Sequence, residues 1–163
     1  VPMLRRVWDA CAGKWDRVVL TSRHPTDDPL CDYLTKEKMR FQRGMLMDVL
    51  SRYACLAFAE RPDCLVRVCG DAPFLEAAWI KAAVSAGGPV FIPGALHAAD
   101  WQTWCKCDFE AGPEDWEHAA YYWFKERPRI IELVPPSYRT INTQRDVDWA
   151  RAQQFTIPSS RKP

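Results

Sequence analysis

The segment Cys64-Leu-Val-Arg-Val-Cys69-Gly70-Asp71-Ala72-Pro73 decides the fold class of this chain. Its first six residues are mostly apolar, which is typical of a strand that is buried on both faces of a sheet. The Gly-Asp-Ala-Pro sequence breaks that strand and leads into an apolar-rich helical stretch at residues 75–86. A buried strand followed at once by a helix is the repeating unit of an α/β protein.

The same alternation continues along the whole chain. Further strands are predicted at residues 17–21, 40–42, 90–92 and 130–134, and further helices at residues 2–12, from Asp28 onward, and at 46–60, 99–107, 114–126 and 144–154. Such alternation predicts a three-layer α/β/α fold with a mostly parallel sheet. Ligands of these sheets bind outside the carboxyl ends of the strands. The segments after the strands are therefore the candidate site: residues 21–24, residues 70–73 and the turn around Asn142.

Length and composition are those of one ordinary globular domain. We expect that domain at residues 1–156 of the 163, followed by a loose polar tail at 157–163. Hydrophobic residues make up 48% and charged residues 26%, which excludes wholesale disorder. The 22 Lys and Arg nearly balance the 21 Asp and Glu, so composition predicts no nucleic-acid partner. No apolar run approaches the roughly 18 residues of a membrane span, so no membrane partner is predicted either.

The seven cysteines favour a reducing, cytoplasmic setting. Seven is an odd number, and five of the cysteines are scattered singly among apolar residues, where Cys acts as a small buried hydrophobe. Cys105 and Cys107 form a C-x-C pair, but no second pair stands at zinc-ligand spacing. The sequence therefore predicts neither a disulfide framework nor a zinc site.

Asp71 is the sharpest single candidate, and its sequence context supports two interpretations. A carboxylate directly after a buried strand lies where Mg²⁺ is held, because Mg²⁺ uses one or two carboxylates and takes its other ligands from water and substrate phosphates. The alternative is that Asp71 caps a helix beginning near Phe74. Spacing alone does not choose between these roles.

Six short motifs, spread over residues 1–153, occur together in one order. They are Thr21-Ser22 at the end of the first strand; Asp27-Asp28-Pro29-Leu30; Arg43-Gly44 with Asp48-Val-Leu50 and Arg52-Tyr53; Arg67-Val-Cys-Gly-Asp71-Ala-Pro73; Glu117-His118; and Arg139-Thr-Ile-Asn142-Thr with Asp146. In this order they resemble the spore coat polysaccharide-type cytidylyltransferases, which are relatives of the CMP-sugar synthetases. The resemblance implies a nucleotide-diphospho-sugar transferase-like fold.

The resemblance also implies a reaction and a set of roles. The reaction is the Mg²⁺-dependent coupling of CTP to an acidic sugar, with release of pyrophosphate, in polysaccharide or glycan precursor synthesis. Carried over by position, catalytic roles fall to Asp71 and Arg67, and the metal ligands would be Asp71 and Asn142. The implied sugar contacts are Glu117 and His118, and the implied nucleotide contacts are Thr21, Ser22, Arg43, Asp48 and Arg52. Related synthetases often pair, so a homodimer is a further expectation.

The chain departs from the family pattern in two places. The family begins with a strand and a loop resembling Arg-x-x-Ser-x-Arg-Leu-Pro-x-Lys, which holds the triphosphate, whereas residues 1–7 resemble the helix after that loop. The resemblance therefore implies an N-terminally truncated version of the fold. In addition, Asn142 stands where the family usually has a second metal-binding Asp. The loss of that charge would remove several kcal/mol of transition-state stabilisation, an order of magnitude typical of such sites.

Three functional hypotheses follow from these matches and departures. The first is an active cytidylyltransferase-type enzyme. The second is a degenerate relative that binds a nucleotide or a sugar nucleotide without turning it over. The third is a structural domain that keeps only the fold. Asp71 and Arg67 favour the first two, whereas Asn142 and the absent loop favour the second over the first.

Overall fold

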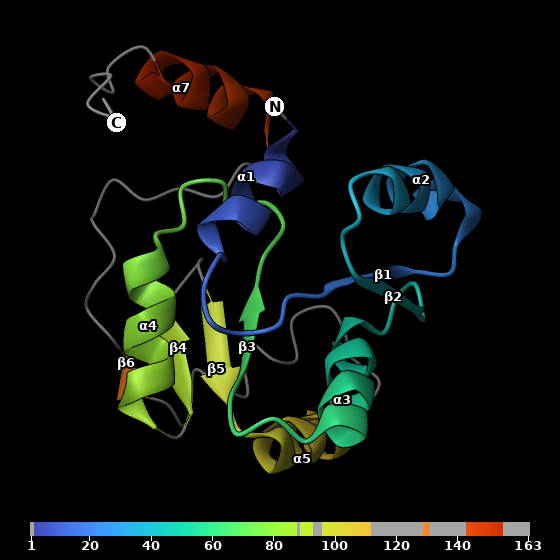
Figure 1. Cartoon of the computed structure of the whole chain (residues 1–163), viewed down its shortest axis with the longest axis vertical. Coiled ribbons are helices and arrows are strands. Elements are labelled where there is room, and N and C mark those ends of the chain that lie inside the picture. The colour runs from blue at the N-terminus through green and yellow to red at the C-terminus, as the bar shows by residue number, and fades with distance from the viewer. Residues whose placement is uncertain (1, 88, 93–95, 112–128, 131–142, 155–163) are drawn as a thin grey trace.

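The computed structural model describes residues 2–87, 89–92, 96–111, 129–130 and 143–154 (Figure 1). Three sequence-predicted features lie outside the described residues: the helix at 114–126, the strand positions 131–134 and the tail at 157–163. The candidate site residues Glu117, His118 and Asn142 lie outside them as well.

Helices and strands alternate along the described chain. The helices are α1 (Met3–Ala10), a short 3-10 helix η1 (Pro25–Asp27), α2 (Asp28–Lys36), α3 (Val49–Glu60), α4 (Ala77–Ala86), α5 (Trp101–Ala111) and α7 (Gln144–Gln154). The strands are β1 (Val19–Ser22), β2 (Phe41–Gly44), β3 (Leu65–Val68), β4 (Val90–Ile92), β5 (Leu96–Ala99) and β6 (Arg129–Ile130). The predicted α/β alternation is confirmed, with element ends shifted by a few residues.

The described strands form two sheets. In the first, β1 and β2 pair in parallel, with Val19 opposite Phe41 and Ser22 opposite Gly44. The second has the order β3-β5-β4-β6, in which β5 runs antiparallel to both of its neighbours and β6 runs parallel to β4. The antiparallel strand β5 was not predicted. It follows β4 after a connection too short for a parallel crossover, so it must return in the opposite direction.

Helices cover both faces of the four-stranded sheet. On one face α3 and α5 pack around Leu65 and Trp104, and Trp104 Nε1 donates a hydrogen bond of 3.1 Å to the Leu65 carbonyl oxygen. On the other face α4 packs against Val66 and Val68, together with residues from the end of α1. Neighbouring residues of a strand point to opposite faces, which is why Leu65 and Val66 belong to different clusters. The three-layer α/β/α architecture is confirmed.

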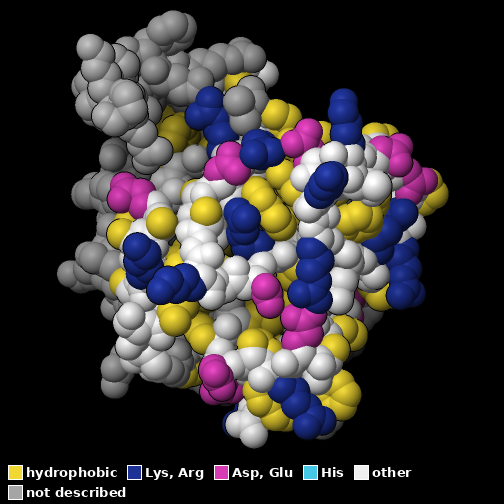
Figure 2. Space-filling model, in the orientation of Figure 1, with side chains coloured by type: hydrophobic (Ala, Val, Ile, Leu, Met, Phe, Trp, Pro, Cys, Tyr) yellow, Lys and Arg dark blue, Asp and Glu magenta, His cyan; other side chains and the backbone are white. Residues whose placement is uncertain are grey.

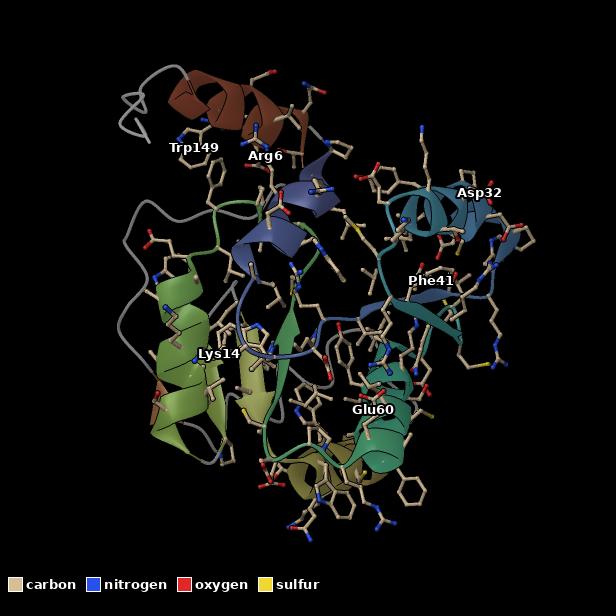
Figure 3. All side chains as sticks on the ribbon, viewed as in Figure 1. Arg6, Lys14, Asp32, Phe41, Glu60 and Trp149 are labelled. Carbon is tan, nitrogen blue, oxygen red and sulfur yellow. The ribbon has the colours of Figure 1, made fainter. Side chains whose placement is uncertain are left out.

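A cavity of about 530 Å³ separates the two sheets. Its lining includes residues of β1 and β3, which are the facing end strands of their sheets, and residues of α1 and α3. Near its rim, an ion pair between Arg40, just before β2, and Glu60, at the end of α3, joins the two parts of the molecule. Figure 3 labels Glu60 on α3.

The last described helix returns to the segment after β3. Figure 3 shows Trp149 projecting from α7 toward the rest of the molecule, and its ring meets that of Phe74 edge to face at a centroid distance of 5.3 Å. Phe74 follows the Gly70-Asp71-Ala72-Pro73 turn in sequence. The contact therefore brings the carboxyl-terminal part of the described chain close to the carboxyl end of β3.

Candidate functional site

At the carboxyl end of β1, Asp27 accepts three hydrogen bonds at a single oxygen. Its Oδ2 atom lies 2.7 Å from Thr21 Oγ1, 2.9 Å from the Ser22 nitrogen and 2.6 Å from Ser22 Oγ. The hydrogen bonds from Ser22 and then Thr21 lower the pKa of Asp27 to about 2. Thr21 and Ser22 are buried, so their hydroxyls hold Asp27 in place and are not free to bind a ligand.

Sequence context predicted a different role for Asp27. The Asp27-Asp28-Pro29 pattern suggested that it caps the following helix, but its side chain makes no capping hydrogen bond to α2. Asp27 does hold the N-cap position of α2, but the chain turns through η1 and brings its carboxylate to β1 instead of to the helix. Thr21-Ser22 and Asp27, five residues after Ser22, can be seen in the sequence. Only the fold shows that their side chains are hydrogen-bonded to one another through Asp27.

Arg43, at the carboxyl end of β2, is engaged by the same loop. Its Nε atom donates to the Ser22 carbonyl oxygen at 2.7 Å, and its Nη2 atom donates to the His24 carbonyl oxygen at 3.1 Å and to Asp28 Oδ1 at 2.7 Å. The planar guanidinium suits such convergent contacts. Arg43 thus shapes the loop after β1, with most of its donors occupied by protein.

Arg52 and Asp48 organise the loop between β2 and α3. Arg52 donates to the Met45 carbonyl oxygen at 2.7 Å and to the Leu46 carbonyl oxygen at 2.6 Å. Asp48 accepts a hydrogen bond of 2.9 Å from the Ser51 nitrogen and so caps α3. Glycine is needed at position 44, because a Cβ atom there would lie 2.7 Å from Arg52 Cγ. Both candidate nucleotide ligands therefore support the loop.

Arg67 lies on the α3 and α5 face of β3, over an aromatic pair. Its guanidinium carbon is 5.5 Å from the centre of the Tyr53 ring, and that ring stacks on Trp104 at 5.5 Å. A cation at this distance from an aromatic ring is stabilised by the ring's quadrupole. Arg67 Nε is buried and has no hydrogen-bond partner among the described residues. The charge of Arg67 is thus positioned by packing, and none of the described carboxylates forms an ion pair with it.

Asp71 differs from the other acidic candidates. It is only partly exposed, and it makes no hydrogen bond or ion pair with another described residue. It does not cap a helix, because α4 begins at Ala77 and its N-cap position is Glu76. Its neighbour Gly70 faces open space with respect to the described residues, since a Cβ atom placed there would meet none of them within 4 Å. Asp71 therefore offers a free carboxylate beside open space.

Tyr53 of α3 lies in the electrostatic surroundings of the end of β3. Burial raises the pKa of the Tyr53 hydroxyl, and the charges of Arg67 and Arg52 oppose that shift. Burial likewise raises the pKa of the Cys69 thiol, which Arg67 opposes and Asp71 reinforces. Arg67 thus acts on both Tyr53 and Cys69, and Asp71 acts on Cys69. Sequence analysis had not assigned a role to Tyr53.

The described residues contain no group of three or more His, Cys, Asp and Glu side chains that could hold a metal ion. A divalent ion that arrives with a phosphate ligand needs fewer protein ligands, and the free Asp71 carboxylate fits that requirement. On the face shown in Figure 2, basic and acidic side chains are interspersed. None of the helices in the described part is both long and apolar enough to cross a membrane.

The fold is that of a known nucleotidyltransferase. A cytidylyltransferase from Leptospira borgpetersenii serovar Hardjo-bovis (strain JB197) superimposes with a TM-score of 0.78 and 19% sequence identity, over 96% of this chain and 77% of that one. No protein-family model matches the sequence. No curated protein matches it either. The chain thus shares its fold with a cytidylyltransferase at low sequence identity.

Proposed function

We propose that this protein is a cytidylyltransferase that transfers the cytidylyl group of CTP to an acidic sugar. The observation that carries the proposal is the carboxylate of Asp71 at the carboxyl end of β3, which has no hydrogen-bond or ion-pair partner among the described residues and follows Arg67 of the same strand. This edge of a sheet is where α/β proteins bind their ligands. The fold shared with a cytidylyltransferase supports the choice of reaction.

The proposed reaction is a substitution at phosphorus. A hydroxyl oxygen of the sugar forms a bond to the α-phosphorus of CTP and releases its proton to solvent, the bond from that phosphorus to the bridging oxygen breaks, and pyrophosphate leaves with the electron pair. Mg²⁺ would neutralise the charge of the phosphates when bound. We assign Asp71 and Asn142 as the residues that would hold it. Arg67 would bind an anionic oxygen of the substrate.

The other candidate residues receive supporting roles in this proposal. Thr21 and Ser22 hold Asp27, and Arg43 and Arg52 hold the two loops that would enclose the nucleotide. We propose that the loops contact the base and ribose mainly through their backbone atoms, because these side chains are already engaged. Glu117 and His118 are proposed for the sugar side on the strength of the resemblance alone.

The second candidate function is nucleotide binding without turnover. It is favoured by Asn142, which is a neutral amide where the resembling family has a carboxylate. A domain that keeps only the fold is the third candidate, and a free, partly exposed Asp71 beside open space speaks against it. None of the seven cysteines, all of which are described, forms a disulfide, in keeping with the proposed cytoplasmic setting. A homodimer, spore coat-type biology and polysaccharide precursor synthesis rest on the resemblance.

The test compares Asp71→Asn with Asp63→Asn, a matched change in an exposed residue before β3. Calorimetric binding of CTP with Mg²⁺ should weaken by about 100-fold or more in Asp71→Asn and stay unchanged in Asp63→Asn, since one charged ligand is worth several kcal/mol. Pyrophosphate release with a panel of acidic sugars then separates turnover from binding. Binding without release would support the second candidate. Absence of CTP binding by the unmodified protein would refute the first two.

A further inference from the structure

The position of Asp71 depends on the turn that carries it. Its side chain makes no hydrogen bond or ion pair with another described residue, so the backbone of the turn determines where the carboxylate lies. A group that binds a reacting phosphate must be held to within about 0.5 Å of its productive position, and the packing around it supplies that precision. The residues that fix this turn are therefore part of any site built on Asp71.

Buried residues next to α4 anchor one end of this turn. The Ala72 nitrogen donates to the Cys69 carbonyl oxygen at 3.2 Å, and the Leu75 nitrogen donates to the Ala72 carbonyl oxygen at 3.1 Å. Ala72 is fully buried, and Leu75 belongs to the apolar cluster around α4. At Gly70, by contrast, a Cβ atom would meet none of the described residues within 4 Å. The turn is therefore held mainly from its carboxyl-terminal end.

Phe74, which follows the turn, supplies a second anchor through α7. Its ring meets that of Trp149 edge to face, with the ring centres 5.3 Å apart and the ring planes at 79° (Figure 3). Val147 and Trp149 are the only large apolar residues in the sequence of α7, so the apolar surface with which this helix can dock is small and is dominated by the Trp149 ring. An aromatic pair of this geometry contributes, beyond burial, an energy equivalent to about a tenfold change in an equilibrium constant.

The start of α7 is fixed by its own side chains. Asp146 Oδ2 accepts hydrogen bonds from the Thr143 nitrogen at 2.8 Å and from Thr143 Oγ1 at 2.7 Å. These bonds hold the backbone at the first turn of the helix. Thr143 directly follows Asn142, one of the two residues assigned above to Mg²⁺. The ring contact of α7 therefore joins the two segments that carry the proposed metal ligands.

We propose that Trp149 is a positioning residue for the reaction: through Phe74 it holds the turn at the place where the Asp71 carboxylate meets the phosphates of CTP. Trp149 does not itself contact the substrate in this role. Its role in the site rests on the proposed function, whereas the link between α7 and the turn does not. Loss of the Trp149 ring should therefore loosen the turn whether or not a nucleotide is bound.

Hydrogen exchange without nucleotide tests the link between α7 and the turn. In Trp149→Ala the Ala72 and Leu75 amides should exchange about 10-fold faster, because the turn opens more often. Trp149→Phe keeps an aromatic ring to meet Phe74 and should restore most of the protection. The Val19 amide, which is hydrogen-bonded to the backbone before β2, should exchange at an unchanged rate in both variants. Equal exchange of the turn amides in Trp149→Ala and the unmodified protein would overturn the inference.

A double-mutant cycle on calorimetric binding of CTP with Mg²⁺ tests the role in the site. Trp149→Ala should weaken binding about 10-fold in the unmodified background but less than about twofold in Asp71→Asn, where the turn has no charge left to position. Trp149→Phe should restore the affinity. Trp101→Ala, the matched loss of a partly exposed Trp on α5, should leave it unchanged. A merely structural role of Trp149 would weaken binding equally in both backgrounds, and that result would overturn the inference.

The two experiments separate failure of this inference from failure of the proposed function. If Asp71→Asn weakens CTP binding and Trp149→Ala does not, the function stands and the inference falls. If the unmodified protein binds no CTP, the proposed function and the role of Trp149 in the site are refuted together, and exchange still decides whether α7 holds the turn. If Trp149→Ala fails to fold, Phe74→Leu, which removes the ring and keeps an apolar side chain, replaces it in both measurements.

Discussion

The carboxyl ends of β1 and β3 contrast in how their polar groups are used. At β1, Asp27 accepts from Thr21 and Ser22, and Arg43 donates to two carbonyl oxygens and a carboxylate. At β3, Asp71 has no described partner, and Arg67 rests on an aromatic ring with a buried Nε atom unsatisfied. Polar groups that hydrogen bond to other protein groups hold the backbone in place, whereas polar groups without such partners remain able to bind a ligand. In the first region the polar groups are satisfied by one another, and in the second they lack such partners among the described residues.

The largest expected effect comes from breaking the β1 region. Asp27→Ala should lower the free energy of unfolding by about 2–3 kcal/mol, because it leaves buried donors of Thr21 and Ser22 without an acceptor. Asp71→Ala should change it by less than about 0.5 kcal/mol, since Asp71 makes no hydrogen bond or ion pair with another described residue. Urea unfolding of both variants measures the difference. Equal destabilisation would contradict the contrast between the two regions.

The second prediction uses pH to separate the two regions. Burial, reinforced by Arg67, lowers the pKa of His97, which stands opposite Arg67 in the sheet, to about 3 from an ordinary 6.5. Its contribution to stability is therefore complete above pH 6.5 and is lost as the pH falls toward 3. The loss approaches about 1.4 kcal/mol per pH unit. The pKa of Asp27, at about 2, confines the response of the β1 region to far lower pH, below 3.8.

Urea unfolding at pH 6 and pH 5 tests this difference. The unmodified protein should lose about 1 kcal/mol more stability over that unit than His97→Gln, which has no titrating ring. Asp27→Asn should keep the full pH response of the unmodified protein in the same interval. If the stability of His97→Gln fell as much between pH 6 and pH 5 as that of the unmodified protein, His97 would not be the group that is protonated in this interval.

A third, smaller effect concerns Asp48, for which the structure shows a cap and the resemblance implies a nucleotide contact. Asp48→Ala should cost about 1 kcal/mol of stability through loss of the cap on α3. Asp48→Ser keeps a capping oxygen and should restore most of that stability. If Asp48 only supports the loop, Asp48→Ser also retains CTP affinity by calorimetry. Restored stability with lost affinity would instead establish a direct contact.

The smallest effect is expected at Asp28, the exposed partner of Arg43. Asp28→Asn removes one of three contacts made by Arg43 and leaves those to the Ser22 and His24 carbonyl oxygens. Exposed ion pairs contribute little to stability. The urea midpoint should stay close to that of the unmodified protein. A large shift would mean that Asp28, and not the backbone, fixes the position of Arg43.

Sequence alone predicted the part of the fold that depends on local signals. The strand from Leu65, the break at Gly70 and the position of Asp71 followed from apolar runs and turn residues. The strand β5 was missed because Leu96-His97-Ala98-Ala99 is short and contains helix-forming alanines next to α5. Its strand conformation is set by pairing with β3 and β4, which no local pattern records.

The sequence indicated which residues lie near the candidate site, but it did not indicate which atoms each of them contacts. Sequence reasoning selected Thr21, Ser22 and Arg43. The hydrogen bonds from Thr21 and Ser22 to Asp27, and from Arg43 to the Ser22 carbonyl oxygen, depend on the turn of the chain through η1. The contact of Arg67 with Tyr53 joins a strand and a helix whose facing sides are set by packing of the whole domain. Periodicity assigns a residue to a face of its element, and only tertiary structure selects its neighbour there.

The two hydrogen bonds from Arg52 to the loop after β2 bear on how readily the methionines of that loop are oxidised. It fixes the backbone at Met45 and Leu46, while the side chains of Met45 and Met47 remain 62% and 64% exposed. Met39 is only 4% exposed. Mild peroxide should therefore convert the two loop methionines to sulfoxides well before Met39. The rate at which Met45 and Met47 each gain the mass of one oxygen atom would show whether a bound molecule covers this loop.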